Sequence, residues 1–151
     1  MENEATEILL TEELLQLVSF RIGNEEFGVD ILKVQEINRM MRLTIVPNTP
    51  QYIEGVINLR GRIIPVIDLR TRLGLPHKEP DANTRIIVTE VEENTVGFIV
   101  DEVNEVLRIP KSIIEPPPAM VGEVNSDFIT AIAKLNNTLL ILLDLNKILT
   151  F

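Results

Sequence analysis

A β-hairpin between Gly55 and Arg70 is the sequence feature that most constrains the fold of this chain. The segment reads Gly-Val-Ile-Asn-Leu-Arg-Gly-Arg-Ile-Ile-Pro-Val-Ile-Asp-Leu-Arg, so two apolar runs flank a polar turn centred on Arg60-Gly61. Gly61 can adopt the positive φ of a tight turn, and the β-branched residues on both sides suit strands. The segment therefore predicts two antiparallel strands, with Pro65 at an edge or bulge because it has no N–H for a ladder.

Short helices are predicted at the ends of some strands. Asp68 directly precedes Leu69 to Leu73, and its side chain is suited to cap a short helix there. Asp30 is similarly placed to cap a helical turn through Ile31 to Ile37. The segment from Arg39 to Val46 is predicted as a further strand.

The second half of the chain repeats the pattern of the first. An offset of 69 residues places Gly97 on Gly28 and Glu105 on Glu36. An offset of 76 residues places Asn136-Asn137 on the Arg60-Gly61 turn, and it also places Asp144-Leu145 on Asp68-Leu69. The extra length falls in the Pro-containing segment Lys111 to Asp127. The chain therefore contains two similar β-units, and since each has too few strands to close a thick core alone, we expect them to share an apolar interface.

These patterns predict an all-β chain of two small barrels with short helices. Residues 1–13 are expected to form a flexible acidic tail, barrel one is expected over about 14–80 and barrel two over about 81–151. Ile63-Ile64 and Leu139 to Leu143 are apolar on both faces, which indicates burial inside a barrel on one side and against its neighbour on the other.

Charge and composition exclude several classes of function. The chain has 151 residues and a net charge of −9, which disfavours nucleic acid as a partner. It has no cysteine, no signal peptide is expected, and its longest apolar run, Leu139 to Leu143, is too short to cross a bilayer. We therefore expect a soluble, cytoplasmic protein without direct membrane insertion.

Catalytic and cofactor motifs are missing from the sequence. His77 is the only histidine, and its place in a loop indicates a solvated imidazole, so we expect no Ser-His or Cys-His mechanism and no multi-histidine metal site. Asp68 and Asp144 could pair as acid and base, but their position before short helices favours capping. The sequence contains no glycine-rich phosphate loop. We expect no catalytic residues, no metal and no cofactor.

Three segments in register resemble the CheW family of chemotaxis coupling proteins. They are Val-Gln-Glu-Ile at 34 to 37, the hairpin with its Asn-Leu-Arg-Gly turn, and Val-Gly-Phe-Ile-Val-Asp at 96 to 101. The resemblance extends over roughly residues 14 to 151. It implies a pair of intertwined five-stranded SH3-like barrels.

The resemblance also implies a function and partners. CheW-like proteins are non-enzymatic adaptors that bridge the histidine kinase CheA, through the CheW-like regulatory domain of the kinase, to the cytoplasmic tips of methyl-accepting chemotaxis receptors. The protein would then be cytoplasmic and recruited to membrane-bound receptor arrays. The glutamate of Val-Gln-Glu-Ile and the arginine of Asn-Leu-Arg-Gly, which are associated with coupling in the family, correspond here to Glu36 and Arg60.

The candidate partner-binding residues lie on and around the hairpin. Arg60 is not required by turn geometry, since the matching turn is Asn-Asn, and its guanidinium suits a carboxylate of a partner or of Glu36 itself. Met40 and Met41 stand between two arginines, and on a strand one of them must face outward, where a flexible methionine could contact a protein. The full set is Val34, Glu36, Met40, Met41, Leu43, Asn58, Arg60 and Arg62.

Two alternatives stay open. The chain could be a coupling domain of a larger kinase or of a CheW-receiver protein, although nothing in it resembles an ATP-binding or receiver domain. It could also be a small acidic ligand-binding or hydrolytic β-barrel. That class would need an enclosed polar pocket with convergent carboxylates and a raised pKa.

Overall fold

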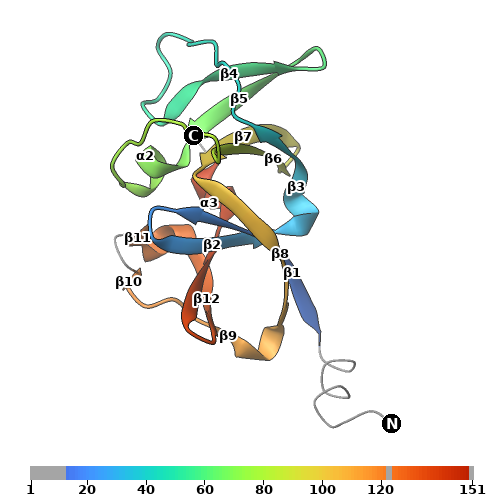
Figure 1. Cartoon of the computed structure of the whole chain (residues 1–151), viewed down its shortest axis with the longest axis vertical. Coiled ribbons are helices and arrows are strands. Elements are labelled where there is room, and N and C mark those ends of the chain that lie inside the picture. Colours follow the sequence, from blue (N-terminus) through green and yellow to red (C-terminus); the bar gives the residue numbers. More distant parts are fainter. Residues whose placement is uncertain (1–12, 122–123, 150–151) are drawn as a thin grey trace.

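Two antiparallel-rich sheets, stacked along the long axis of the molecule, make up most of the structure (Figure 1). The structure is a computed structural model that describes residues 13–121 and 124–149. The predicted N-terminal tail thus lies outside the described residues except for Glu13.

The middle barrel is the sheet formed by one continuous stretch of chain. In order across the sheet its strands are β3 (Val34–Arg39), β6 (Arg85–Val91), β7 (Asn94–Val100), β5 (Arg62–Asp68) and β4 (Ile53–Leu59). It occupies the upper half of Figure 1. Helix α2 (Leu69–Leu73) follows β5 directly.

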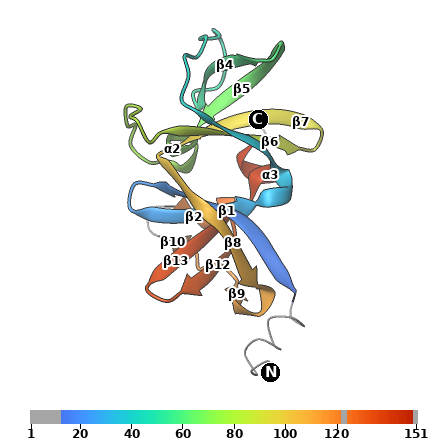
Figure 2. The ribbon, with the colours of Figure 1, turned by 45° about the vertical axis from the view of Figure 1, so that its right-hand side comes forward.

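The terminal barrel combines the beginning of the chain with its end. In order its strands are β8 (Glu102–Pro110), β1 (Leu14–Ile22), β2 (Glu25–Asp30), β13 (Thr138–Leu143), β12 (Ile129–Leu135) and β9 (Ile114–Glu115). The remaining short elements are η1 (Ile31–Lys33), η2 (Lys111–Ile113), β10 (Met120–Val121), β11 (Val124–Asn125), η3 (Ser126–Phe128) and α3 (Leu145–Ile148). Figure 2 shows β8 leaving the middle barrel and running across the terminal one.

The predicted division into barrels over 14–80 and 81–151 is wrong. The first hairpin of each sequence repeat joins the sheet of the other repeat: β6-β7 lies between β3 and β5, and β1-β2 lies between β8 and β13. In each barrel the second strand of the hairpin pairs in parallel with the last strand of the other repeat, with Val66 opposite Gly97 in the middle barrel and Leu142 opposite Gly28 in the terminal barrel. Since these pairs are related by the same two offsets, the repeat itself is confirmed, and the two units are intertwined.

The apolar core lies mainly between the barrels. A large cluster there includes Phe20, Phe27 and Phe98, each completely buried, with ring centroids of Phe20 and its two neighbours 5.8 and 5.6 Å apart. Two smaller clusters fill the interiors of the barrels. Burial on this scale makes the shared interface a single core rather than a contact between two independent units.

The central hairpin has the predicted turn and cap. Arg60 and Gly61 both have positive φ, 53° and 85°, which is the geometry of a two-residue turn that matches strand twist. Asp68 caps α2 by accepting from the Arg70 N–H at 3.1 Å and from the Thr71 hydroxyl at 3.0 Å. Pro65 pairs only with β4, because the pairing of β5 with β7 begins at Val66.

Three local predictions are wrong. The helical turn after Asp30 ends at Lys33, and β3 begins at Val34. The segment from Met40 to Pro50 is not a regular strand: it contacts β4 through one isolated bridge between Thr44 and Val56. Ile63 is 65% exposed, since the tip of the β4-β5 hairpin extends beyond the neighbouring barrel, whereas Ile64 is buried as expected.

A buried ion pair joins the two barrels. Arg70, on α2 of the middle barrel, donates to Asp101 through Nε at 3.1 Å and Nη2 at 2.6 Å. Asp101 also accepts from the Gly23 N–H in the β1-β2 turn at 2.8 Å. Burial by itself would raise the pKa of Asp101, but the Arg70 guanidinium and the Gly23 N–H bring it below its ordinary value.

Within the described residues, no helix has the length and apolar character needed to span a membrane. The longest helix in residues 13–121 and 124–149 is α2, with five residues.

Candidate partner-binding surface

The structure brings Glu36 and Arg60 together at the tip of the middle barrel. Arg60 reaches from the β4-β5 turn and donates through Nη2 to Oε2 of Glu36 on β3. Asn38, two residues further along β3, donates to the other carboxylate oxygen at 2.8 Å. Glu36 is thereby held from both sides, and the hydrogen bond from Asn38 together with the Arg60 guanidinium lowers the pKa of Glu36.

Arg60 remains accessible in this pair. Its side chain is 72% exposed, against 25% for Glu36. An exposed ion pair of this kind contributes little to folding, about 0 to 1 kcal/mol. The guanidinium has five N–H donors in a planar fork, so it can donate to a further carboxylate or carbonyl while it remains paired with Glu36.

Asn58 and Arg62 shape the same tip. Asn58 accepts from the Gly61 N–H at 2.9 Å, which closes the turn that presents Arg60. Arg62 donates from Nη2 to the hydroxyl of Thr95 on β7 at 2.8 Å, and it is exposed. Asn58 thus stabilises the turn, and Arg62 adds positive charge beside Arg60.

The prediction that Met40 or Met41 faces fully outward is wrong. Both are half-buried and, with half-buried Leu43, pack against the apolar cluster inside the middle barrel. The reason is that this segment is not a strand, so its side chains do not alternate between two faces. Val34, at the start of β3, instead packs against the core between the barrels.

Four residues of the middle barrel were missed from the sequence. Asn38 orients Glu36, and Thr95 orients Arg62. Ile45 and Ile63 are 81% and 65% exposed, which is unusual for isoleucine. Thr95 gives no local sequence signal because its partner Arg62 lies on another strand, whereas Asn38 lies two residues from Glu36 on β3 and could have been considered with it. The run of apolar residues around Ile63 extends to the end of a hairpin, where burial on both faces is not possible.

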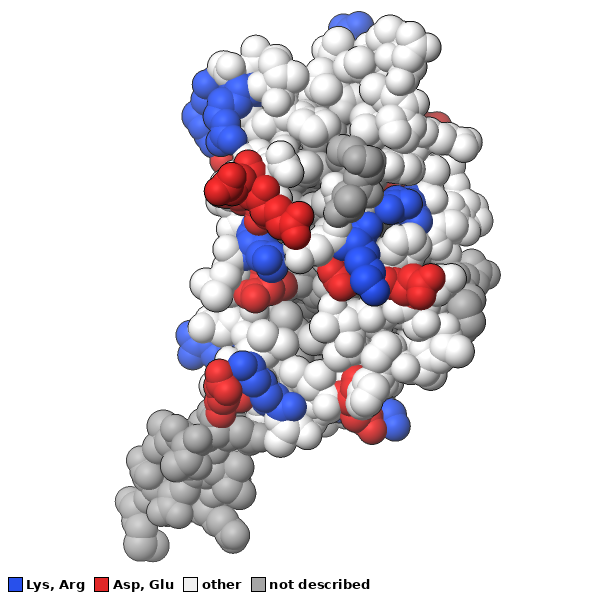
Figure 3. Space-filling view, turned by 180° about the vertical axis from the view of Figure 1, so that it is seen from behind, with Lys and Arg blue, Asp and Glu red and all other residues white. Residues whose placement is uncertain are grey.

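Charged side chains of both signs alternate on one face of the molecule. On the face seen from behind, basic and acidic residues lie next to one another along the molecule and do not gather into one large patch of a single sign (Figure 3). The net charge of −9 is therefore not concentrated on this face. Recognition here would depend on individual charged groups more than on a broad field.

His77 lies outside this surface, beside the cap of α2. Its side chain is 54% exposed, with Nδ1 3.4 Å from Asp68 and Nε2 3.2 Å from Glu79, and these carboxylates raise its pKa. Glu54, Asp68 and His77 place one possible metal-donor atom each within 4.8 Å of one another. Since both Asp68 oxygens already accept hydrogen bonds from α2, the arrangement is that of a helix cap with a solvated imidazole beside it.

Comparison with known proteins places this architecture in a family. A family model described as CheW-like domain matches residues 16–151. Chemotaxis protein CheW of Klebsiella aerogenes is 40% identical over 135 residues, which cover 89% of this chain and 81% of that protein. Chemotaxis protein CheW of Bacillus subtilis is 40% identical over 134 residues, which cover 89% of this chain and 86% of that protein. The crystal structure of the scaffolding protein TtCheW from Thermoanaerobacter tengcongensis superposes with a TM-score of 0.85 at 37% identity, covering 92% of this chain and 90% of that one. The chain belongs to the CheW-like family of chemotaxis proteins.

Proposed function

We propose that this protein is a non-enzymatic scaffold that couples chemoreceptors to the histidine kinase CheA. Its membership of the CheW-like family supports this, as does its similarity to a protein titled a scaffolding protein. A scaffold acts by binding alone: two surfaces on one rigid body hold two partners in a fixed relation, so that a change in one partner alters the other. The single core shared by both barrels is suited to that rigidity.

The surface proposed for partner binding is the tip of the middle barrel with the strand and segment beside it. The observation that carries this proposal is Arg60, whose guanidinium is fixed by Glu36 and yet remains 72% exposed. A charged group that is pre-oriented and accessible loses little side-chain freedom when it binds. The proposed partner-binding residues are Val34, Glu36, Met40, Met41, Leu43, Asn58, Arg60 and Arg62.

The rival class, a ligand-binding or hydrolytic barrel, would need convergent carboxylates in an enclosed pocket. Burial and the nearby Asp68 charge do raise the pKa of Glu54. However, Asp68 is engaged as a helix cap, and His77 beside it is more than half exposed. Within the described residues, no buried side-chain polar atom lacks a hydrogen-bond partner, so no buried donor or acceptor is left over for a substrate. These observations favour the scaffold.

The test is a binding experiment with a receptor-tip fragment and the regulatory domain of CheA, used separately and together. We expect the full chain to bind both and Arg60→Ala to weaken one association by about 1 to 3 kcal/mol, the scale of a lost charge-assisted contact. Arg21→Ala is the matched control, since Arg21 also forms a half-exposed ion pair, with Glu102, but on the terminal barrel. Unchanged binding of both partners by Arg60→Ala would refute the role of Arg60, and binding of neither partner by the unaltered chain would refute the function.

A further inference from the structure

The terminal barrel has a pocket at the place that corresponds to the Glu36–Arg60 pair of the middle barrel. The pocket has a volume of about 400 Å³ and is lined by Glu26, Glu105, Leu107, Leu135, Asn136 and Thr138. By the offsets of 69 and 76 residues, these six positions match Thr95, Glu36, Asn38, Leu59, Arg60 and Arg62. The strand pairings agree, since Leu59 pairs with Arg62 in the middle barrel as Leu135 pairs with Thr138 in the terminal one.

The carboxylate is kept at this place, but its partners are not. Glu105 stands where Glu36 stands, while Leu107 replaces the amide of Asn38 and Asn136 replaces the guanidinium of Arg60. In the part of the chain that the structure describes, no hydrogen bond or ion pair to the Glu105 side chain is found. The short Asn136 and Thr138 side chains leave open the space that two arginine side chains fill in the other barrel.

The backbone of Glu105 is nevertheless fixed by a buried side chain. The completely buried Ser19 donates through its hydroxyl to the Glu105 carbonyl at 3.0 Å and accepts from the Glu105 N–H at 3.2 Å. The position that matches Ser19 in the middle barrel is Val88, which cannot make such bonds. The buried hydroxyl thus fixes the backbone position from which the exposed Glu105 carboxylate lines the pocket.

The chemistry of the pocket selects a cation with an apolar stem. Glu26, on β2, adds a second carboxylate where the middle barrel has the Thr95 hydroxyl, and Asn104 donates to it. Leu107 and Leu135 supply an apolar floor, since both are half-buried against the core of the terminal barrel. Arginine combines a flat cation that can bind carboxylates through two N–H groups with an aliphatic stem that packs on leucine.

We propose that this pocket binds an arginine side chain presented by another protein, which would do in the terminal barrel what Arg60 does within the middle barrel. The internal repeat is the reason for choosing arginine: the equivalent glutamate already binds one, and that arginine is carried on the tip of a protein hairpin. The site is separate from the tip of the middle barrel, so the proposal does not depend on which proteins that tip binds.

The test uses the full chain labelled with ¹⁵N and titrated with N-acetyl-arginine N-methylamide, which mimics an arginine inside a protein chain. We expect saturable shifts of the amide signals of residues 104–107 and 135–138, and none at Glu36. The citrulline analogue has the same shape without the charge and is expected not to bind. The lysine analogue is expected to bind more weakly, because an ammonium cannot engage a carboxylate in the bidentate manner of a guanidinium.

Two variants decide the assignment. Glu105→Gln, nearly isosteric on an exposed strand, is expected to weaken binding of the arginine probe at least about tenfold, the scale of one lost charge-assisted contact. Asn136→Arg should fill the pocket from within and abolish saturable binding; Arg60 shows that this turn position accepts an arginine at positive φ. Equal binding by Glu105→Gln, by Asn136→Arg or by the citrulline or lysine analogue would overturn the proposal, as would shifts centred elsewhere.

Discussion

The link that follows β7 and the link that follows β2 occupy equivalent places in the two repeats, yet they are built from different residues. Asp101 in the first link is buried and bound by Arg70 and the Gly23 N–H. The residue 69 positions earlier is Leu32 in η1, which is 89% exposed. The strand pairings follow the repeat, while the polar contacts of Asp101 have no counterpart at Leu32.

This difference indicates that two kinds of constraint act on the chain. The strand pairings of both barrels depend on which side chains are apolar, and both repeats meet that condition with different residues. A polar contact depends on one specific donor and one specific acceptor, so it can exist in one repeat and be absent from the other. The places where the repeats differ are thus where individual stabilising or binding roles are to be sought.

The largest change in stability is expected when the buried ion pair of Arg70 and Asp101 is broken. Asp101→Ala leaves the Arg70 guanidinium poorly paired in a largely buried site, and we expect it to reduce the free energy of unfolding by about 3 to 5 kcal/mol. Urea unfolding followed by circular dichroism measures this. Glu102→Ala removes the neighbouring half-exposed pair with Arg21 and should cost under about 1 kcal/mol. Equal effects of the two changes would contradict the unequal roles of these carboxylates.

The same ion pair predicts a pH dependence. Because the pKa of Asp101 is lowered in the folded protein, its stabilising contribution is fully present above its ordinary pKa of 3.8 and is lost as the pH falls through the lowered value. Unfolding midpoints measured at pH values on both sides of 3.8 should therefore show less acid sensitivity in Asp101→Ala than in the unaltered chain.

A smaller loss of stability is expected from a substitution at Gly55, where the segment around Thr44 passes close to β4. Gly55 is buried under the Thr44 bridge, and a Cβ at this position would lie 2.5 Å from the Thr44 carbonyl oxygen. The matching residue in the terminal barrel is Ala131, which is also buried but is accommodated. Gly55→Ala should reduce the free energy of unfolding by about 1 to 3 kcal/mol through this clash, measured by urea unfolding. A neutral result would show that the segment around Thr44 moves away easily.

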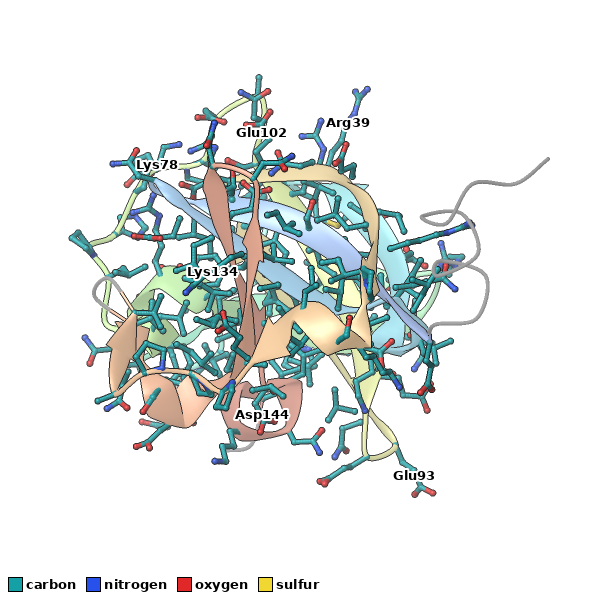
Figure 4. The ribbon with its side chains drawn as sticks, turned by 90° about the horizontal axis from the view of Figure 1, so that it is seen from below. Arg39, Lys78, Glu93, Glu102, Lys134 and Asp144 are labelled. Atoms are coloured by element: carbon teal, nitrogen blue, oxygen red, sulfur yellow. The ribbon has the colours of Figure 1, made fainter. Side chains whose placement is uncertain are left out.

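A substitution in the turn of the β6-β7 hairpin should stabilise the protein, in contrast to the substitutions above. Glu92 and Glu93 have positive φ, 52° and 69°, whereas the first repeat has Gly23 at the position of Glu92. Figure 4 shows Glu93 projecting from the edge of the molecule, so little packing is lost on changing this turn. Glu92→Gly should raise the thermal midpoint slightly, by a stabilisation of about 0.5 kcal/mol, since relief of backbone strain exceeds the added freedom of the unfolded chain. Asn136→Gly is the control and should have a smaller effect, because asparagine tolerates positive φ.

The smallest effect on stability is expected at the exposed pair. Arg60→Ala and Glu36→Ala should each change the free energy of unfolding by under about 0.5 kcal/mol, and their coupling energy in a double-mutant cycle should be of the same size. The same cycle measured for partner binding separates two roles of Glu36. If Glu36 only orients Arg60, the double variant binds no worse than Arg60→Ala; if Glu36 itself contacts a partner, the double variant binds more weakly.

Local sequence was sufficient for much of the fold and for part of the candidate surface. Turns and caps depend on neighbouring residues and on backbone preferences, so they could be predicted one segment at a time. Examples are the turns at Arg60-Gly61 and Asn136-Asn137 and the cap at Asp68. The repeat was visible for the same reason. Glu36 and Arg60 were singled out by resemblance to a family. Arg60 was also singled out because the matching turn is Asn-Asn, which shows that turn geometry does not require an arginine.

Tertiary structure alone decided how the segments combine. A strand has the same alternating pattern whichever sheet it joins, so the pattern could not show that β1-β2 and β6-β7 exchange between barrels. Only the resemblance to the CheW family implied that the barrels are intertwined. Nor could it show that Ile63 is exposed, since burial depends on how far a neighbouring barrel reaches. The contacts of Arg60 with Glu36, of Arg70 with Asp101 and of Ser19 with Glu105 join residues that are 24, 31 and 86 positions apart. Such contacts form only once the whole core has fixed both backbones, and that is why the sequence determined the elements of this protein and the folded chain determined its candidate sites.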